Sequence, residues 1–444
     1  MKNYDVAVIG GSAAGIPAAI TARRHYPEKS IVVIRKEEKV SIPCGIPYVF
    51  GTVMSTDKNL IPDTSLSGNG IDLIVSEATS LDCASKTVGL ANGETVAYDK
   101  LILSTGSMPL VPPIPGSDKE GVFSVQKDVV YLDNMLQYLE NVKNVVVVGG
   151  GFIGVEFADE LRKRGLNVTI VEMLPYCLML ALDESYCKEA EEKLESLELN
   201  VRTRSKLTEI LGNSKVTGVK LENGDVIDAD MVLIGIGVKP NVTLAEQAGL
   251  ENNKGGIVVD SYMRTSDDSV FACGDCTSKV SFFTGKYSPL KLASIATMEA
   301  RVAGANLYKI SREQHGVIGV FSTIIDNQVF GVAGLGEKRA REIGYDIACG
   351  EIEQPNRHPG GMPGMTLLKV KLIFNKVNRE LLGGCVRGGD SAGETINTIS
   401  ACIQKKMTAD EIAMFQLGTH PAVTASPISY QLVNAAEIAI QAMN

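Results

Sequence analysis

The sequence predicts an α/β fold made of two copies of one strand–turn–helix–strand unit, followed by a C-terminal α+β region. Two stretches carry the repeat, YDVAVIGGSAAGIPAAITARR and KNVVVVGGGFIGVEFADELRKRG. In each, an apolar strand runs into a glycine-rich turn and then into a helical pattern, and a second β-rich run follows. The texture changes from about Phe321, where alternating strands and helical segments carry no glycine-rich turn, so a binding or assembly role is expected there.

Length and composition limit the class of protein. The 444 residues exceed one ordinary core, so two or three domains are expected. The formal net charge of −9 argues against nucleic acid or an anionic membrane as a general partner. No apolar stretch approaches the ~20 residues that cross a bilayer, and the N-terminus lacks a signal-peptide pattern. Nine scattered cysteines fit a reducing cytoplasm, which is the expected location.

The two glycine-rich turns, Gly10 to Gly15 and Gly149 to Gly154, predict two dinucleotide sites. Glycine lets the chain turn sharply and lets phosphate oxygens approach backbone N–H groups at a helix N-terminus. The second turn matches GxGxxG fully, and Glu172 ends the next strand, where a carboxylate can bind a ribose diol. NADH is therefore favoured over NADPH. The first turn departs, with Ser12 at the middle glycine position and Arg35 where an acidic residue is usual.

A third motif, FACGDCT, ends a short β-rich run with Asp275 after a glycine. An aspartate there can reach a ligand hydroxyl, and an ordinary Asx turn is the alternative. The same stretch contains Cys273-x-x-Cys276, which can mean a redox pair or half a zinc site. No second CxxC and no paired histidines accompany it, so we interpret the spacing as coincidence and expect no metal.

A lone cysteine stands in KVSIPCGIPYVFG, directly after Pro43. Proline suits the first turn of a helix, and a helix N-terminus favours the thiolate, which is the nucleophilic form. Val49 occupies the position five residues on, so Cys44 has no neighbouring sulfur in the sequence. A buried, inert cysteine is the alternative. The position favours a redox role for Cys44.

These features resemble the pyridine nucleotide–disulfide oxidoreductase superfamily over essentially the whole chain. The resemblance lies in the GGSAAG and GGGFIG turns, Cys44, STGSMP, IGIGVKPN and FACGD. It implies an FAD-binding domain over residues 1–112 and 243–320, an NAD(P)H-binding domain over 113–242, and a C-terminal dimerisation domain over 321–444. FAD and NADH as cofactors and a homodimer follow from the same resemblance.

The resemblance also implies roles residue by residue. Asp275 is expected to bind the ribityl chain of FAD. The other residues expected at FAD are Gly10, Ser12, Gly15, Arg35, Lys36, Ala78, Thr105, Gly106 and Ala293. Those expected at NADH, with NADPH as an alternative donor, are Gly149, Gly151, Ile153, Gly154, Glu172 and Gly237.

The single cysteine resembles one branch of the superfamily, which holds coenzyme A-disulfide reductases, NADH oxidases, NADH peroxidases and persulfide or polysulfide reductases. Family oxidases and peroxidases usually carry a histidine inside the first turn, where this chain has Ala13. The first expectation is therefore NADH-dependent reduction of a small disulfide, of CoA or persulfide type, through Cys44. The alternatives are an NADH oxidase making hydrogen peroxide or water, and an electron-transfer reductase for a rubredoxin-type acceptor.

A CoA substrate or bound CoA is expected from three arginines. Arg23 and Arg24 match a pair that lies near the nucleotide end of CoA in CoA-disulfide reductases, and Arg357 lies in NRHPGG, which is similar to a substrate segment there. The planar guanidinium suits phosphate oxygens. Solvated surface charges are the alternative for all three.

His420-Pro421 resembles the His-Pro of two-cysteine disulfide reductases, whose histidine acts as acid or base at the sulfur site of the other subunit. Their usual glutamate is replaced by Ala425. A histidine can protonate a leaving thiolate without that partner, though less efficiently. His420 is therefore the expected acid, with a structural role at the dimer interface and substitution by Tyr430 as alternatives.

Overall fold

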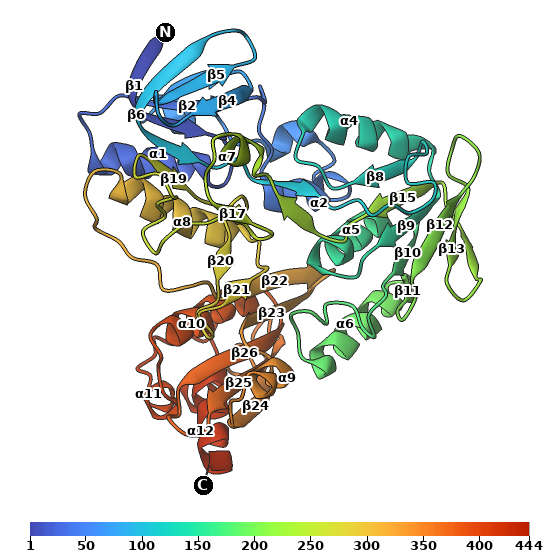
Figure 1. Cartoon of the computed structure of the whole chain (residues 1–444). Helices are drawn as coiled ribbons and strands as arrows, with labels where there is room; N and C mark the ends of the chain where they lie inside the picture. The colour runs from blue at the N-terminus through green and yellow to red at the C-terminus, as the bar shows by residue number, and fades with distance from the viewer. Residues whose placement is uncertain (444) are drawn as a thin grey trace. The chain divides into compact units, whose positions relative to one another are not determined.

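The computed structural model describes residues 1–443, which form two compact units (Figure 1). We call them the first and the second unit. The first unit comprises Met1–Pro113, Gly121–Val142 and Leu233–Val317. The second comprises Ile114–Glu120, Lys143–Val232 and the chain from Ile318.

A seven-stranded sheet forms the centre of the first unit, in the order β3-β2-β1-β6-β5-β4, with β19 also paired to β6. Its parallel part reads as runs of valine, isoleucine and leucine, and all five residues of β2 are buried, as expected for strands covered on both faces. β4 and β5 continue it as antiparallel strands. The bounds are β1 Lys2–Ile9, β2 Ile31–Arg35, β3 Asp72–Val75, β4 Ala78–Asp82, β5 Thr87–Leu90, β6 Thr95–Leu103 and β19 Val270–Ala272.

Two helices, α1 (Gly15–His25) and α8 (Ala293–Asn306), lie side by side against this sheet (Figure 1). Small residues let them approach, since a Cβ on Gly304 would lie 2.4 Å from the carbonyl oxygen of Ala18. β1, β2, β6 and β19 are parallel, so their carboxyl ends share one edge of the sheet. Ligands of such sheets bind outside that edge.

Shorter elements complete the first unit, and among them β7 pairs antiparallel with β16. Their bounds are η1 Pro43–Gly45, α2 Ile46–Val49, η2 Thr56–Asn59, α3 Thr64–Ser67, β7 Ser107–Pro109, β8 Val122–Ser124, α4 Val129–Tyr138, η3 Leu139–Asn141, β16 Val238–Pro240, α7 Thr243–Gln247, β17 Asn252–Asn253, β18 Gly256–Ile257, β20 Lys279–Val280 and β21 Tyr287–Ser288.

The second unit begins with a smaller copy of the parallel pattern, in which β9 and β11 flank β10. α5 and α6 accompany these strands, β12, β13 and β14 form an antiparallel sheet, and β15 leads the chain back to the first unit. The bounds are β9 Asn144–Val148, α5 Phe152–Lys163, β10 Asn167–Val171, α6 Glu184–Ser196, β11 Asn200–Arg202, β12 Leu207–Leu211, β13 Gly218–Leu221, β14 Val226–Asp228 and β15 Met231–Ile234.

The C-terminal part of the second unit is a five-stranded antiparallel sheet, ordered β22-β23-β26-β25-β24. α10 packs on β26 and β23, and α12 packs so closely on β24 that a Cβ on Gly350 would lie 1.8 Å from the carbonyl oxygen of Ala435. The bounds are β22 Val320–Ile325, β23 Gln328–Gly334, α9 Glu337–Glu342, β24 Ile347–Pro355, β25 Leu367–Asn375, β26 Leu381–Gly388, α10 Ser391–Gln404, α11 Ala409–Ala413, η4 Pro427–Ser429 and α12 Gln431–Met443.

The predicted α/β architecture, with two dinucleotide-type units and a C-terminal α+β region, is confirmed. The expected domain bounds remain a prediction, and the compact units divide the chain differently. Residues 121–142 cluster with the first unit, because Ser41 Oγ donates to the Lys127 carbonyl at 3.0 Å and Thr56 Oγ1 donates to Asp133 at 2.6 Å. Within residues 1–443 no helix has the length and apolar character that crossing a bilayer requires.

Candidate functional site

The first glycine-rich turn needs glycine at both ends. Gly10 has φ +108°, and a Cβ there would lie 2.2 Å from the carbonyl oxygen of Ser104. A Cβ on Gly15 would lie 1.8 Å from the carbonyl oxygen of Gly10. α1 begins at Gly15 without a side-chain cap, so its first N–H groups remain available to an anion. Half-buried Ser12 stands between them.

The second turn repeats this geometry with one difference. Gly149 has φ +107°, and a Cβ on Gly154 would lie 1.9 Å from the Gly149 carbonyl oxygen. A Cβ on Gly151 would meet nothing within 4 Å, so its open side leaves room for a ligand. α5 begins at Phe152, again without a side-chain cap. Both turns therefore fit the pyrophosphate of a dinucleotide.

Glu172 is bound to the second turn itself. Its Oε2 accepts from the Gly150 N–H at 2.6 Å and its Oε1 from the Leu174 N–H at 2.7 Å, and the residue is only 8% exposed. A carboxylate has about four acceptor sites, so capacity for ribose hydroxyls remains. Ile153 is partly exposed at the start of α5. Gly237, with φ +114°, belongs to the first unit, unlike the other residues expected at NADH.

Arg35, at the end of β2, makes four hydrogen bonds to the protein. Its guanidinium donates to both carboxylate oxygens of Asp63, at 2.7 and 3.0 Å, and to the carbonyl oxygens of Glu37 and Glu38. Its side chain is 1% exposed, and a Cβ on Gly11 would lie 2.7 Å from Arg35 Cδ. Arg35 thus supports the first turn from behind, and its contact with FAD stays a prediction.

Five more residues expected at FAD lie in the first unit. Lys36 follows Arg35 and is largely exposed, and Ala78 begins β4. Gly106 has φ +71° with open space where a Cβ would point, and Ala293 begins α8. Thr105 precedes Gly106 in the same turn. The first unit therefore contains every residue expected at FAD.

Asp275 follows a tight turn at Gly274, which has φ +84°. Its Oδ2 accepts from Ser107 Oγ at 2.8 Å and lies 3.3 Å from Lys127 Nζ. Burial raises the pKa of Asp275, but the Lys127 charge and the Ser107 hydrogen bond outweigh burial and leave that pKa below its ordinary value. The carboxylate is thus ionised and placed to accept a hydroxyl. Sequence reasoning missed Lys127, because its contact arises only from tertiary packing.

Cys44 is exposed and sits in η1 directly after Pro43, with α2 following. Its exposure is inconsistent with the buried-cysteine alternative. Asn59 anchors the loop, because its carbonyl accepts from the Ile42 N–H at 2.8 Å and its side chain donates to the Ile42 carbonyl at 3.0 Å. Asn59 is 6% exposed, and sequence reasoning missed it.

None of the nine cysteines, which all lie in the described part of the chain, forms a disulfide. Cys273 and Cys276 are fully buried, and burial raises the pKa of each thiol. The Cys276 sulfur lies 3.5 Å from the carbonyl oxygen of Leu103. Burial also raises the pKa of Cys187 to about 12. These thiols are poor nucleophiles, which separates them from exposed Cys44.

His420 lies on an exposed loop of the second unit next to a second histidine. His358 Nδ1 lies 3.2 Å from the Thr424 carbonyl oxygen, which can accept its N–H, and the Thr424 hydroxyl accepts from the His420 N–H at 2.9 Å. His420 Nδ1 accepts from the Ala422 N–H at 3.2 Å. With Nδ1 as acceptor, the neutral ring carries its proton on Nε2.

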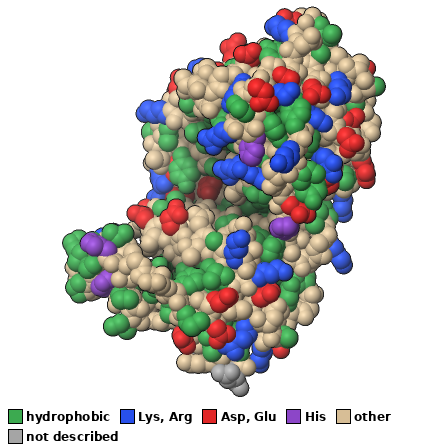
Figure 2. Space-filling model, turned by 90° about the vertical axis from the view of Figure 1, so that its left-hand side faces the viewer, with side chains coloured by type: hydrophobic (Ala, Val, Ile, Leu, Met, Phe, Trp, Pro, Cys, Tyr) green, Lys and Arg blue, Asp and Glu red, His purple; other side chains and the backbone are tan. Residues whose placement is uncertain are grey.

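Figure 2 shows two histidine side chains together on a part of the surface where hydrophobic side chains gather. The C-terminal loop, residues 414–430 between α11 and α12, contributes Met414, Val423 and Ile428, which are 75%, 67% and 88% exposed. Exposed apolar groups of this kind mark a surface for another macromolecule. Tyr430, the alternative acid, is half-buried, and burial raises the pKa of its hydroxyl.

The three arginines expected at CoA differ in their surroundings. Four N–H groups of Arg23 donate to backbone carbonyl oxygens, which favours its structural alternative, whereas Arg24 is exposed. The guanidinium of Arg357 donates to the carbonyl of Pro363 and keeps further N–H groups for a ligand. Arg24 lies in the first unit and Arg357 in the second. The acceptors of Arg23 are Pro27, Lys29, Asn69 and Gly70.

Glu156 is a titratable group that sequence reasoning missed. It lies on α5, two residues beyond Gly154, and burial raises its pKa to about 7, with the nearby charge of Glu160 adding to the shift. An acidic residue on the buried side of a helix was the available signal. Glu156 therefore titrates near neutral pH close to the second turn.

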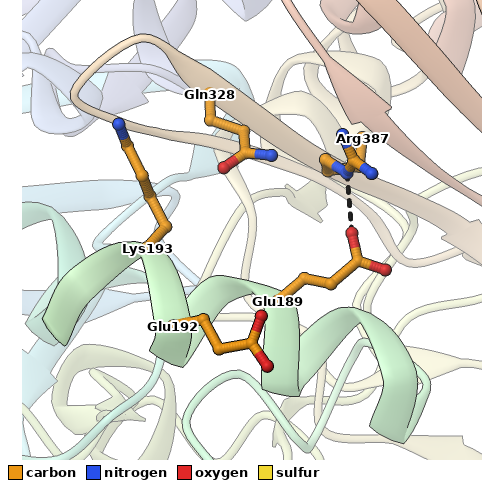
Figure 3. Close-up of a pocket in the computed structure, with 5 residues that line it drawn as sticks. All are labelled: Glu189, Glu192, Lys193, Gln328 and Arg387. Atoms are coloured by element: carbon orange, nitrogen blue, oxygen red, sulfur yellow. Dashed lines mark hydrogen bonds and ion pairs between the residues drawn. The ribbon is translucent and has the colours of Figure 1, made fainter. Parts of the chain in front are cut away.

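A pocket of about 370 Å³ lies elsewhere in the second unit, between α6 and the C-terminal sheet (Figure 3). Arg387 donates to Glu189 at 2.7 Å and also binds Glu353, so its charge is already matched. No residue expected from the sequence lines the pocket. Its lining residues are Glu189, Glu192, Lys193, Gln328 and Arg387.

Comparisons with known proteins agree with this geometry. The profile of the pyridine nucleotide-disulphide oxidoreductase family matches residues 4–300, and the profile of its dimerisation domain matches residues 320–428. An NADH oxidase of Methanocaldococcus jannaschii is 33% identical, over 98% of this chain and 99% of that protein. An NAD(P)H coenzyme A polysulfide/persulfide reductase of Pyrococcus horikoshii is 32% identical, over 94% of each.

A solved structure, the NAD-dependent persulfide reductase from A. fulgidus, superposes with a TM-score of 0.91 at 30% identity and covers 99% of this chain and 83% of that one. The family match spans most of the chain and includes both glycine-rich turns, Cys44 and Asp275. The chain thus belongs to the pyridine nucleotide-disulphide oxidoreductase family and is an FAD-dependent enzyme that uses NAD(P)H.

Proposed function

We propose that this enzyme uses NADH to reduce a small disulfide or persulfide, with CoA as the thiol, through Cys44. The observation that carries the proposal is the exposed thiol at the start of η1, without a second cysteine in its loop. The names of the Pyrococcus horikoshii relative and the A. fulgidus structure support a persulfide or polysulfide acceptor.

Cys44 acts as the nucleophile. Its thiolate attacks one sulfur of R–S–S–R, the S–S bond breaks, one thiolate leaves and a mixed disulfide with Cys44 forms. FAD, when bound, supplies the two electrons taken from NADH that cleave the mixed disulfide. Cleavage regenerates the Cys44 thiolate and releases the second thiol. Because no neighbouring cysteine pairs with Cys44, the substrate must provide the second sulfur.

His420 supplies a proton or hydrogen bond to the leaving thiolate. Its Nδ1 accepts from the Ala422 N–H, so Nε2–H is the group that can donate. Arg24 and Arg357 contact phosphates of CoA, and Asp275 binds a flavin hydroxyl. The dimerisation domain supports a homodimer, in which the C-terminal loop meets a second copy. A reducing cytoplasm is the proposed location, supported by nine cysteines without a disulfide.

NADH oxidation by oxygen is the second candidate. The Methanocaldococcus jannaschii relative is named an NADH oxidase. Ala13 argues against it, because a small apolar side chain in the first turn offers no polar aid to oxygen or peroxide chemistry.

Anaerobic NADH consumption with CoA disulfide or polysulfide tests the proposal. Cys44→Ser is expected to lower turnover at least about hundredfold, because serine cannot form the mixed disulfide. Cys83→Ser, at a half-buried cysteine, is the matched control and keeps its rate. Turnover indifferent to Cys44→Ser points instead to an electron-transfer reductase, and oxygen-dependent turnover faster than that with every disulfide points to the oxidase.

A further inference from the structure

A buried ion pair lies behind the turn that presents Asp275. Lys279 begins β20 and Glu299 lies on α8, with Nζ and Oε2 2.6 Å apart. Their side chains are 1% and 0% exposed. Taking two charges out of water is costly, so such a pair needs a reason beyond attraction between its members.

The pair holds both backbone polar groups of Gly274. Lys279 Nζ donates to the Gly274 carbonyl at 2.5 Å, and Glu299 Oε2 accepts from the Gly274 N–H at 2.9 Å. The Thr277 hydroxyl links the charges, since it accepts from Lys279 at 2.5 Å and lies 3.1 Å from Glu299 Oε2. Gly274 also packs against Ala14, because a Cβ there would lie 2.8 Å from that side chain. The turn therefore has little freedom to move.

Stability alone does not explain the pair. Glu299 Oε1 is buried and has no hydrogen-bond partner among residues 1–443, so the carboxylate is only partly satisfied. Apolar residues of similar volume are often as stabilising as a buried ion pair, or more so. Apolar residues cannot form hydrogen bonds to the N–H and the carbonyl of Gly274, as this pair does.

We propose that Lys279 and Glu299 are positioning residues for FAD. They fix Gly274 so that Asp275, the next residue, presents its carboxylate to a hydroxyl of the flavin, while Ser107 and Lys127 bind that carboxylate directly. The inference rests on the proposed role of Asp275 at the flavin. It is independent of which disulfide the enzyme reduces.

The test compares FAD binding with folding in the double variant Lys279→Met/Glu299→Leu. FAD is removed, and its dissociation constant and the melting temperature of the flavin-free chain are measured. We expect the double variant to fold and to bind FAD about tenfold more weakly, the effect of losing one charge-assisted hydrogen bond. Lys371→Met, which breaks a pair with Asp183 in the second unit, is the control and leaves FAD affinity unchanged.

A double-mutant cycle separates positioning from a general loss of structure. Asp275→Asn weakens FAD binding in the wild-type background and has a smaller effect in the double variant, because Asp275 is no longer held in place there. If the double variant does not fold, Thr277→Val replaces it in the test, because this substitution keeps both charges. FAD binding about threefold weaker is expected for Thr277→Val. Wild-type FAD affinity in the variant that folds, or fully additive effects with Asp275→Asn, would overturn the inference. Absence of disulfide turnover in the unmodified enzyme with FAD bound would count only against the proposed function.

Discussion

The two glycine-rich turns have similar backbones, but the side chain that packs on each turn is a cation in the first and an anion in the second. In each, the residue after the first glycine packs on a side chain at the end of the next strand. Gly11 packs on Arg35, the last residue of β2, and Gly150 packs on Glu172, which directly follows β10. Arg35 is bound by Asp63 and by loop carbonyls, whereas Glu172 accepts an N–H of its own turn. The shared part is expected to bind a pyrophosphate, and the residue at or directly after the strand end is expected to distinguish one nucleotide from the other.

The turns also differ at two inner positions. Ser12 stands in the first where the second has Gly151, whose missing side chain leaves open space. Two residues beyond the last glycine, α1 has Pro17 and α5 has Glu156. The second turn is therefore more open at its middle position, and it has a carboxyl two residues beyond its last glycine, where the first turn has a proline.

The largest effect is expected where the turns are most alike. Gly15→Ala places a Cβ 1.8 Å from a backbone oxygen and Gly154→Ala one at 1.9 Å, so the backbone must shift in each. Gly15→Ala should weaken FAD binding about hundredfold, and Gly154→Ala should raise KM for NADH by a similar factor with flavin retained. Flavin content measures the effect of Gly15→Ala, and steady-state kinetics measure the effect of Gly154→Ala. Gly393→Ala in α10 is the control, because a Cβ there would meet nothing within 4 Å. Loss of the same cofactor from both variants would contradict the assignment.

The next effect concerns the helix after the second turn. Because burial raises the pKa of Glu156 from 4.5 to about 7, the folded protein holds this proton more tightly than the unfolded chain. Its contribution to stability is present below pH 4.5 and is lost as pH rises through 7. Glu156→Gln should remove about 3 kcal/mol of that pH dependence. The free energy of unfolding, measured with denaturant between pH 4.5 and 8, checks this expectation. Glu192→Gln, at an exposed residue, is the control. If Glu156→Gln left the pH dependence of stability unchanged, Glu156 would not have the raised pKa.

Substitutions at the middle position of each turn should affect the two cofactors differently and leave the fold unchanged. Gly151→Ala adds a Cβ that meets only a ligand, so NADH affinity should fall about tenfold while the melting temperature stays unchanged. Ser12→Ala removes only a hydroxyl and should change FAD binding less. Isothermal titration with NADH and flavin titration measure the two. Equal affinity for NADH in Gly151→Ala would show that the cofactor does not approach this glycine.

The smallest effect is expected at the strand end. Glu172→Ala removes the ribose acceptor and the negative charge, so the preference for NADH over NADPH should narrow about fivefold. The ratio of kcat/KM for the two nucleotides is the measurement. Glu222→Ala, at an exposed carboxylate of the same unit, is the control. An unchanged ratio would remove Glu172 from the nucleotide site.

The two turns could be located from the sequence because the local backbone conformation requires glycine at these positions. Gly10 and Gly149 need positive φ, and such a requirement is visible in the order of residues alone. The helical turn that contains Cys44 was predicted in the same way, from Pro43 before it. These features depend on neighbours in the sequence, so a single chain is enough to find them.

Contacts formed by tertiary packing were not predictable in this way. Lys127 reaches Asp275 across 148 positions of sequence, and Glu299 reaches Lys279 across 20. No spacing rule connects such residues before the fold is known. Arg23 shows the reverse case, since an arginine expected at a ligand is taken up by the backbone carbonyls of its own unit.

The anchoring of the Cys44 loop has a consequence for the catalytic cycle. Asn59 and Ile42 join two segments of the loop by hydrogen bonds, and the Cys44 side chain is not part of these two hydrogen bonds. The anchor is therefore the same whether the sulfur carries a substituent or not. Under the proposed mechanism, the backbone hydrogen bonds between Ile42 and Asn59 need not be remade between one substrate molecule and the next.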